Sequence, residues 1–217
     1  TSNFRAGVNA GNSITSGGNF NTVVGDEAGT AITTGDNNTA VGYNAGAAVT
    51  TGTRNTFMGS NAGDAVTEGI QNVGIGREAL GADTLGSNSV AVGNSALRAQ
   101  NFTTATDAYN TAVGDQAGTA VTTGIRNSLV GAEAGMALTN ADHNVAIGFR
   151  ALYADTLGSK SIAIGDVALV NQNFTTATGA FNVAIGHEAG NAVTTGVNNT
   201  LIGALAGDAL TDADNNV

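Results

Sequence analysis

Residues 38 to 54 read N-T-A-V-G-Y-N-A-G-A-A-V-T-T-G-T-R, and residues 55 to 71 repeat the pattern as N-T-F-M-G-S-N-A-G-D-A-V-T-E-G-I-Q. Working outward from this pair, one glycine recurs throughout the chain at steps of 17 residues, apart from one step of 18 and two of 21. These glycines are Gly7, Gly25, Gly42, Gly59, Gly76, Gly93, Gly114, Gly131, Gly148, Gly165, Gly186 and Gly203. Such a fixed period indicates one small structural unit laid down about twelve times.

Other columns accompany the glycine, which we number zero in each repeat. Position −1 is Val or Ile in ten repeats, position +3 is always Ala, and position −4 is Asn except for Ser89 and Ser161. The asparagines are Asn3, Asn21, Asn38, Asn55, Asn72, Asn110, Asn127, Asn144, Asn182 and Asn199. Stacked Asn side chains can hydrogen-bond along a stack and tolerate a left-handed corner, whereas Gly permits positive φ or a close backbone approach.

Short Val, Ile and Thr segments between Gly and Asn favour strands over helices, because 17 residues cannot supply the two helices of a helical repeat. We therefore expect an all-β parallel β-solenoid of about twelve coils, each with two short strands and each adding about 4.8 Å. Residues 1–217 then form a single repeat domain, which we interpret as a fragment of a longer fibre. Residues 72–143 and 144–215 match at roughly two positions in three, which indicates an internal duplication.

Bulky residues exchange places between two kinds of repeat. Eight repeats have Gly at +4 and an aliphatic residue at +7, whereas four have Leu at +4, a polar residue at +7, and Leu or Phe at +9. Close-packed interiors disfavour both voids and overpacking, so we expect +4, +7 and +9 to share one core. In the strand before the glycine we expect −1 to face inward and −2 outward. Since the −2 residues are also small or apolar, a second copy of the chain should cover that outer face.

Composition excludes several classes of partner. Seven Lys plus Arg against seventeen Asp plus Glu give a net charge of −10, which disfavours nucleic acid and anionic membranes. The absence of Cys excludes disulfides and thiolate metal sites. No run approaches the roughly 20 apolar residues of a spanning helix, so we expect no direct membrane insertion.

The repeats resemble those of known fibrous proteins. S-V-A-V-G-N-S-A-L at 89–97 and S-I-A-I-G-D-V-A-L at 161–169 resemble the head repeats of trimeric autotransporter adhesins. N-T-A-V-G-Y-N-A-G at 38–46 resembles the repeats of phage tail fibres and of large surface proteins that often end in a self-cleaving trimerisation chaperone. The resemblance covers nearly the whole chain. It implies a left-handed β-roll assembled as a homotrimer, next to other fibre segments, outside a cell, on its surface or on a virion.

A fibre segment of this kind is expected to be a stiff rod that presents or forms a receptor-binding surface. Two repeats are longer by four residues, Q-N-F-T-T-A-T-D-A-Y-N at 100–110 and Q-N-F-T-T-A-T-G-A-F-N at 172–182, and should bulge outward. Phe102 and Phe174 hold the +9 core position. Tyr109 and Phe181 are the expected contacts with a cell-surface glycan or protein receptor, because aromatic rings beside Thr and Asn can stack on sugar rings.

Other readings depend on isolated columns. His143 and His187 lie at corners whose equivalents are Asn215 and Asp115, so we expect solvated side chains, no catalysis, no metal and no cofactor. A Thr column at +8 is the basis of an alternative, an ice-binding β-solenoid, although a flat array would need two columns on one face. Asp-rich corners at 139–144 and 211–216 are the basis of another, a calcium-binding surface-layer or matrix β-roll, although they lack its glycine-aspartate nonapeptide.

Overall fold

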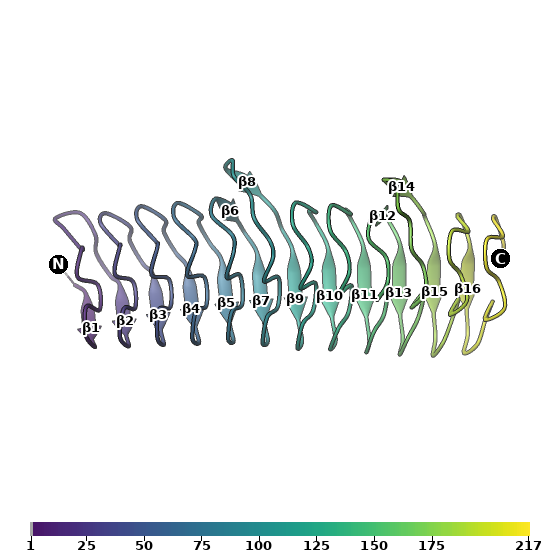
Figure 1. Cartoon of the computed structure of the whole chain (residues 1–217), viewed down its shortest axis with the longest axis horizontal. Helices are drawn as coiled ribbons and strands as arrows, with labels where there is room; N and C mark the ends of the chain where they lie inside the picture. The colour runs from purple at the N-terminus through teal and green to yellow at the C-terminus, as the bar shows by residue number, and fades with distance from the viewer. Residues whose placement is uncertain (1) are drawn as a thin grey trace. The chain divides into compact units, whose positions relative to one another are not determined.

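The chain is a parallel β-solenoid of about twelve coils, as expected. The computed structural model describes residues 2–217, and this range is all-β with no helix (Figure 1). It forms two compact units, divided in the sequence between Tyr109 and Asn110. Each unit holds six of the recurrent glycines and therefore six coils.

In both units, one short strand from each coil joins a parallel sheet. The first unit has the order β1 (Phe4–Ala6), β2 (Thr22–Val24), β3 (Thr39–Val41), β4 (Thr56–Met58), β5 (Val73–Ile75) and β7 (Val90–Val92). The second has β9 (Thr111–Val113), β10 (Ser128–Val130), β11 (Val145–Ile147), β13 (Ile162–Ile164), β15 (Val183–Ile185) and β16 (Thr200–Ile202). The register pairs equivalent residues, for example Val41 with Met58, so each sequence column becomes a column in space.

The expectation of two strands in every coil is wrong. Within residues 2–217, a second strand occurs only in the long repeats and the repeats before them, where β6 (Gly86–Ser87) pairs with β8 (Thr106–Asp107) and β12 (Gly158–Ser159) with β14 (Thr178–Gly179). Elsewhere the segment after the glycine forms successive tight turns, closed by bonds such as Ala28 N to Gly25 O at 3.2 Å. Left-handed residues at +2 and +4, such as Glu27 (φ 61°) and Gly29 (φ 55°), interrupt the extended backbone that a strand requires.

The two faces of the main strand are the reverse of those expected. Residues at −2, such as Ala40 and Leu129, are buried, whereas Val and Ile at −1 lie on the outside. Alternation along a strand places −2 on the same side as −4, and the Asn at −4 must point inward to reach across the coil. Asn127 Nδ2, for instance, donates to Ala141 O at 2.8 Å. The inference that a second chain covers the −2 face is therefore wrong about the face.

The asparagine column forms the expected ladder. Asn127 N donates to Asn110 Oδ1 at 2.9 Å, and Asn144 N donates to Asn127 Oδ1 at 2.9 Å. From Asn21 onward, the left-handed corner lies on the residue before each Asn of this column, such as Arg126 (φ 58°), and not on the Asn itself. The glycine column needs both properties expected of it: Gly42 has φ +133°, and a Cβ there would lie 2.6 Å from Gly59 O.

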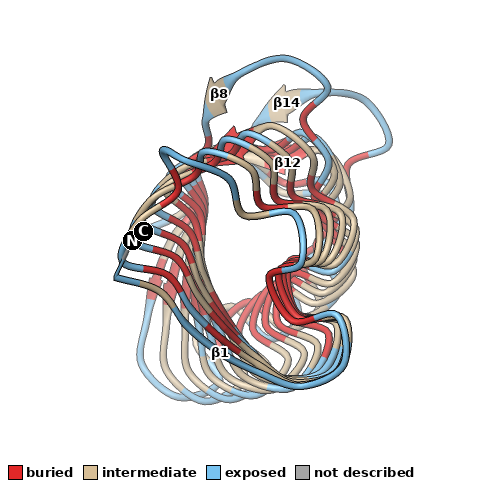
Figure 2. Ribbon diagram, turned by 90° about the vertical axis from the view of Figure 1, so that its left-hand side faces the viewer, coloured by how far each residue is buried: buried red, intermediate tan, exposed pale blue. Residues whose placement is uncertain are grey.

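The core positions follow the predicted exchange of volume. Leu80 and Leu97 at +4 are fully buried, as is Val66 at +7 in a repeat with Gly at +4. A second exchange, which the sequence reasoning missed, occurs at −2. Phe57 fills space left by two glycines, since a Cβ on Gly74 would lie 3.0 Å from Phe57 Cδ1 and a Cβ on Gly63 would lie closer still to the ring. Figure 2 shows the inward-facing parts of the main strands as buried in successive coils.

Candidate functional site

The two long repeats project from the coils, as the sequence predicts. Figures 1 and 2 show the loops that carry β8 and β14 standing out beyond the neighbouring coils. Each loop is tied at its base by a short parallel ladder, which pairs Gly86 with Thr106 in the first unit and Gly158 with Thr178 in the second. Phe102 and Phe174 are buried, which confirms their core position.

Tyr109 and Phe181 end these loops as exposed side chains. They are 52% and 51% exposed, and both have left-handed backbone conformations, with φ of 52° and 53°. They belong to different units. The Phe181 ring lies against Gly179, and Lys160 Nζ lies 4.9 Å from the ring centroid. Both aromatic residues are therefore available to a ligand at the surface.

A groove runs beneath each loop, and the two grooves occupy equivalent places. The first groove, about 350 Å³, is lined by Glu68 and Ile70, by Leu85 and Ser87, and by residues 105–107 of the loop. The second groove, about 390 Å³, is lined by Asp142 and His143, by Ser159 and Lys160, and by residues 177–179. The sequence reasoning predicted the protruding loops but not these grooves, whose walls come from three segments distant in sequence.

The two grooves have the same framework but different charges. In the first, Ser87 Oγ accepts from Ile70 N at 3.0 Å, and in the second Ser159 Oγ accepts from Asp142 N at 2.9 Å. The first groove carries two carboxylates, Glu68 and Asp107. The second carries Lys160 and His143 beside one carboxylate, Asp142. The duplicated loops therefore present chemically distinct sites.

A buried carboxylate supports the base of each loop. In the first unit, Asp83 Oδ2 accepts from Gln100 Nε2 at 2.6 Å, and Asp83 Oδ1 accepts from Gly86 N at 3.0 Å and from Phe102 N at 3.1 Å. Burial raises the pKa of Asp83, while these N–H donors lower it by a smaller amount. The described residues provide no ion pair for this carboxylate. The cluster joins β6 to the start of the long loop.

The second unit repeats this arrangement. Asp155 Oδ1 accepts from Gly158 N at 2.9 Å and from Phe174 N at 3.1 Å, and its Oδ2 accepts from Gln172 Nε2. Asn182 Nδ2 donates to Gln172 Oε1 at 2.8 Å, which fixes the orientation of the Gln172 amide. Burial likewise raises the pKa of Asp155. The sequence contained the signal for this pairing, because the polar +7 residues always occur as Asp in one repeat and Gln in the next.

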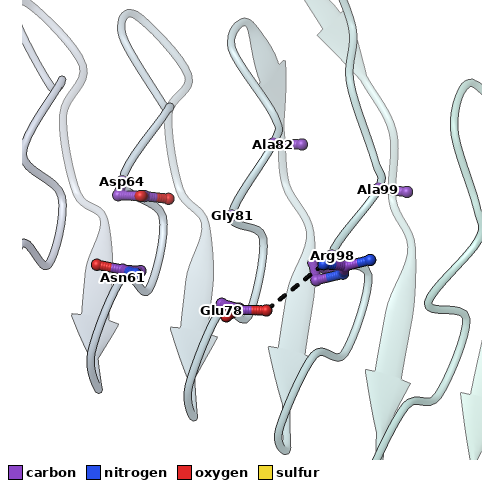
Figure 3. Close-up of a pocket in the computed structure, with 7 residues that line it drawn as sticks. All are labelled: Asn61, Asp64, Glu78, Gly81, Ala82, Arg98 and Ala99. Atoms are coloured by element: carbon purple, nitrogen blue, oxygen red, sulfur yellow. Dashed lines mark ion pairs between the residues drawn. The ribbon is translucent and has the colours of Figure 1, made fainter.

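A third groove, about 430 Å³, lies along the turns of the first unit. Figure 3 shows its lining, which includes Asn61, Asp64, Glu78 and Arg98. Glu78 Oε2 pairs with Arg98 Nη1 at 3.6 Å, and Glu78 Oε1 with Arg77 Nη1 at 2.6 Å. Partial burial raises the pKa of Asp64, and the nearby Glu78 carboxylate raises it further. The Glu78–Arg98 pair links charges on adjacent coils, and the lining of this groove includes no Ser, Thr or His to act as nucleophile or base.

The remaining candidate residues make contacts within the coil stack. His187 is exposed, with its Nδ1 3.3 Å from Asp166 and its Nε2 3.2 Å from Glu188. His143 is an exposed corner residue whose backbone N donates to Ile125 O. Within residues 2–217, no three His, Cys, Asp or Glu side chains gather as metal ligands. In the same range there is no helix that could cross a membrane.

Hydroxyls of the Thr column at +8 and carboxylates of the Asp-rich corners form hydrogen bonds with neighbouring coils. Thr33 Oγ1 donates to Thr50 O at 3.2 Å, and Thr139 Oγ1 donates to Thr156 O at 3.0 Å. Asp214 Oδ1 accepts from Val197 N at 2.8 Å. The Thr column and the Asp corner therefore contribute hydrogen bonds along the stack.

Comparison with known proteins leaves the fold and the grooves as the basis for a functional argument. No protein-family model, curated protein or solved structure matches this chain.

Proposed function

We propose that this chain is a structural and adhesive segment of an extracellular or virion-borne fibre, built as a left-handed β-roll and assembled as a homotrimer. Two properties of the molecule support the proposal. The outer side of the main strands carries an unbroken column of apolar residues at −1, which a partner surface would cover. The long loops carry aromatic side chains and grooves away from the sheet, where a receptor can reach them.

The apolar outer side of the sheet is the observation that carries the proposal. In the second unit, the −1 column consists only of β-branched aliphatic residues, namely Val113, Val130, Ile147, Ile164, Ile185 and Ile202. Val130 and Ile147 are 38% and 39% exposed. Parallel sheets are usually covered on both faces, and contiguous exposed apolar surface marks an interaction site. A second copy of the chain offers a matching column at the same spacing, so self-association covers both surfaces.

The loops leave room for this assembly. In the first unit, β8 lies at the top of Figure 2, whereas β1 lies on the lower left wall. A contact along the outer side of the sheet therefore leaves the loop and its groove accessible. In-register hydrogen bonds between coils give each unit the stiffness that a fibre segment needs. The functional arrangement is a stiff, self-associating body with receptor-facing loops.

Size-exclusion chromatography with light scattering tests the assembly. We expect a species of about three times the 21.2 kDa mass of one chain. The double variant Val130→Asp/Ile147→Asp should run at the mass of one chain with an unchanged far-UV circular dichroism spectrum, because it places charges on the contact surface. Thr195→Asp, at an exposed position in the same unit, is the matched control and should remain associated. A wild-type protein at the mass of one chain would refute the trimer.

A further inference from the structure

The second groove lies beside a column of basic side chains. Arg126, His143 and Lys160 hold the same corner position in three consecutive coils, and all three are exposed. His143 N donates to Ile125 O and Lys160 N to Asp142 O, both at 3.0 Å, so the residues stack one per coil at a spacing of about 4.8 Å. The Arg126 guanidinium Nη1 lies 3.5 Å from His143 Nε2. His143 and Lys160 therefore line the groove, and Arg126 extends this basic column into the preceding coil.

This column is unusual for so acidic a chain. The protein has seven Lys plus Arg and a net charge of −10, and Lys160 is its single Lys. The carboxylate nearest the column in sequence is Asp142, whose Oδ1 accepts from Ile125 N at 2.8 Å. Asp142 is thus engaged by backbone of the preceding coil. Two permanent cations and an imidazole grouped on one corner provide local attraction for an anion.

The equivalent corner of the first unit is closed to an anion. Asn88 stands where the second unit has Lys160, and Asp107 stands where it has Gly179. Asn88 Nδ2 donates to Asp107 Oδ1 at 2.8 Å, so a bond bridges the opening and a carboxylate faces it. In the second unit, Gly179 leaves this space to the Phe181 ring, and Lys160 lies over that ring. The duplicated framework is therefore open and basic at one site only.

We propose that the second groove binds an acidic saccharide. The carboxylate or sulfate group of the saccharide lies against Lys160, His143 and Arg126, and the apolar face of one of its sugar rings stacks on Phe181. The Lys160 side chain is flexible enough to turn from the aromatic ring to the anion, which uncovers the ring for stacking. Ser159 and Thr178 also line the groove. The Ser159 hydroxyl accepts from Asp142 N and can still donate to the sugar, and the Thr178 hydroxyl donates to Thr176 O and can still accept from it. One basic side chain per coil suits a polymer that itself repeats an anionic group.

The inference rests on the proposed role of the loops in receptor contact, but its test is independent of assembly. Isothermal titration of the full chain uses three probes of matched length, namely oligogalacturonate, a heparin oligosaccharide and neutral maltooligosaccharide. We expect binding of one or both acidic probes at one site per chain, with an affinity that falls as salt is added, and none of the neutral probe. Oligogalacturonate carries carboxylates alone, whereas heparin carries both carboxylates and sulfates. Binding of oligogalacturonate therefore shows that a carboxylate suffices, and binding of heparin alone shows that a sulfate is required. The same titration on Val130→Asp/Ile147→Asp should give the same affinity, so a failed trimer and a failed binding site are distinguishable.

Variants taken from the protein's own duplicated copy locate the site. Lys160→Asn and His143→Gln install the residues that the first unit has at the equivalent positions, Asn88 and Gln71, so both variants should fold. Each should weaken binding of the acidic probe about tenfold or more. Phe181→Ala should weaken that binding several-fold. Arg54→Asn changes the same corner position in the first unit and should leave binding unchanged. The triple variant Gln71→His/Asn88→Lys/Asp107→Gly installs the corresponding residues of the second unit and should raise the stoichiometry from one site to two.

Three results would overturn the proposal. The first is failure of the wild-type chain to bind either acidic probe. The second is equal weakening by Arg54→Asn and Lys160→Asn, which would indicate diffuse electrostatic attraction. The third is binding of inorganic sulfate as tightly as the oligosaccharide, which would remove the role of the sugar ring. Circular dichroism melts of each variant establish that a lost signal reports binding and not unfolding.

Discussion

Truncating Asn127 to alanine tests the amide ladder at the centre of a coil. Asn127 is fully buried; its Nδ2 donates to Ala141 O at 2.8 Å, and its Oδ1 accepts from Asn144 N at 2.9 Å. Both partners belong to buried residues, so water cannot replace the amide without opening the coil. The variant therefore leaves one carbonyl and one N–H without a partner.

The expected cost follows from these two groups. A buried polar group left without a hydrogen bond costs about 1–3 kcal/mol, so Asn127→Ala should lower the unfolding free energy by about 2–6 kcal/mol. The assay is guanidinium unfolding of the variant and the wild type, followed by far-UV circular dichroism. Asn140→Ala is the matched control, because Asn140 is exposed and accepts only from the Thr122 and Thr123 hydroxyls. The control should stay within about 0.5 kcal/mol of wild type.

A loss below about 1 kcal/mol in Asn127→Ala would refute the reasoning, because it would mean that the two backbone groups find other partners. Equal losses in Asn127→Ala and Asn140→Ala would also refute it, since burial would then have no influence. The variant Asn127→Asp provides a further check. It keeps the acceptor for Asn144 N but turns a carboxylate toward Ala141 O, so its loss at neutral pH should be at least as large as that of the alanine.

Three further predictions concern the glycine column, the buried carboxylates and the Phe57 site. Gly42→Ala should abolish folding or cost more than about 3 kcal/mol in thermal melts, because Gly42 has φ +133° and a Cβ there would lie 2.6 Å from Gly59 O. The control Gly81→Ala should be tolerated, because Gly81 lacks positive φ and the nearest atom to its added Cβ would be 3.2 Å away. Burial raises the folded-state pKa values of Asp83 and Asp155 above the usual range of an Asp carboxyl, so the ionised carboxylates cost stability at neutral pH. The stability of wild type relative to Asp83→Asn/Asp155→Asn, measured by guanidinium unfolding, should therefore increase as pH falls through the raised pKa, and a decrease would contradict the assigned direction. Phe57→Ala should cost about 3–5 kcal/mol in guanidinium unfolding, and adding Gly74→Ala should recover part of that loss, because the new methyl group enters the space vacated by the ring. Additive losses in the double variant would show that the two sites do not share a cavity.

Several features of the fold were predictable because they depend on local chemistry. The period predicted the coil, Asn at −4 predicted a ladder, and the exchange between Leu80 and aliphatic residues such as Val66 predicted a shared core. The four extra residues before Tyr109 and Phe181 predicted protruding loops. Each of these predictions depends on a property of a single residue type that is the same in any parallel stack of coils. These properties are an amide that hydrogen-bonds along the stack, the absence of a side chain, and a fixed side-chain volume.

The sequence by itself determined the repeat, its columns and the places where the coil expands. Only the tertiary structure decided which face of the strand is internal, because both faces are apolar and alternation does not say which is inside. Closure of the coil resolves this, since Asn127 must reach Ala141 O across the interior and thereby turns Leu129 inward and Val130 outward. Closure also brings Asp83 against Gln100 and places Lys160 beside Phe181. These contacts join residues at least 14 apart in sequence, so they depend on how the coil closes and how coils stack and not on local pattern.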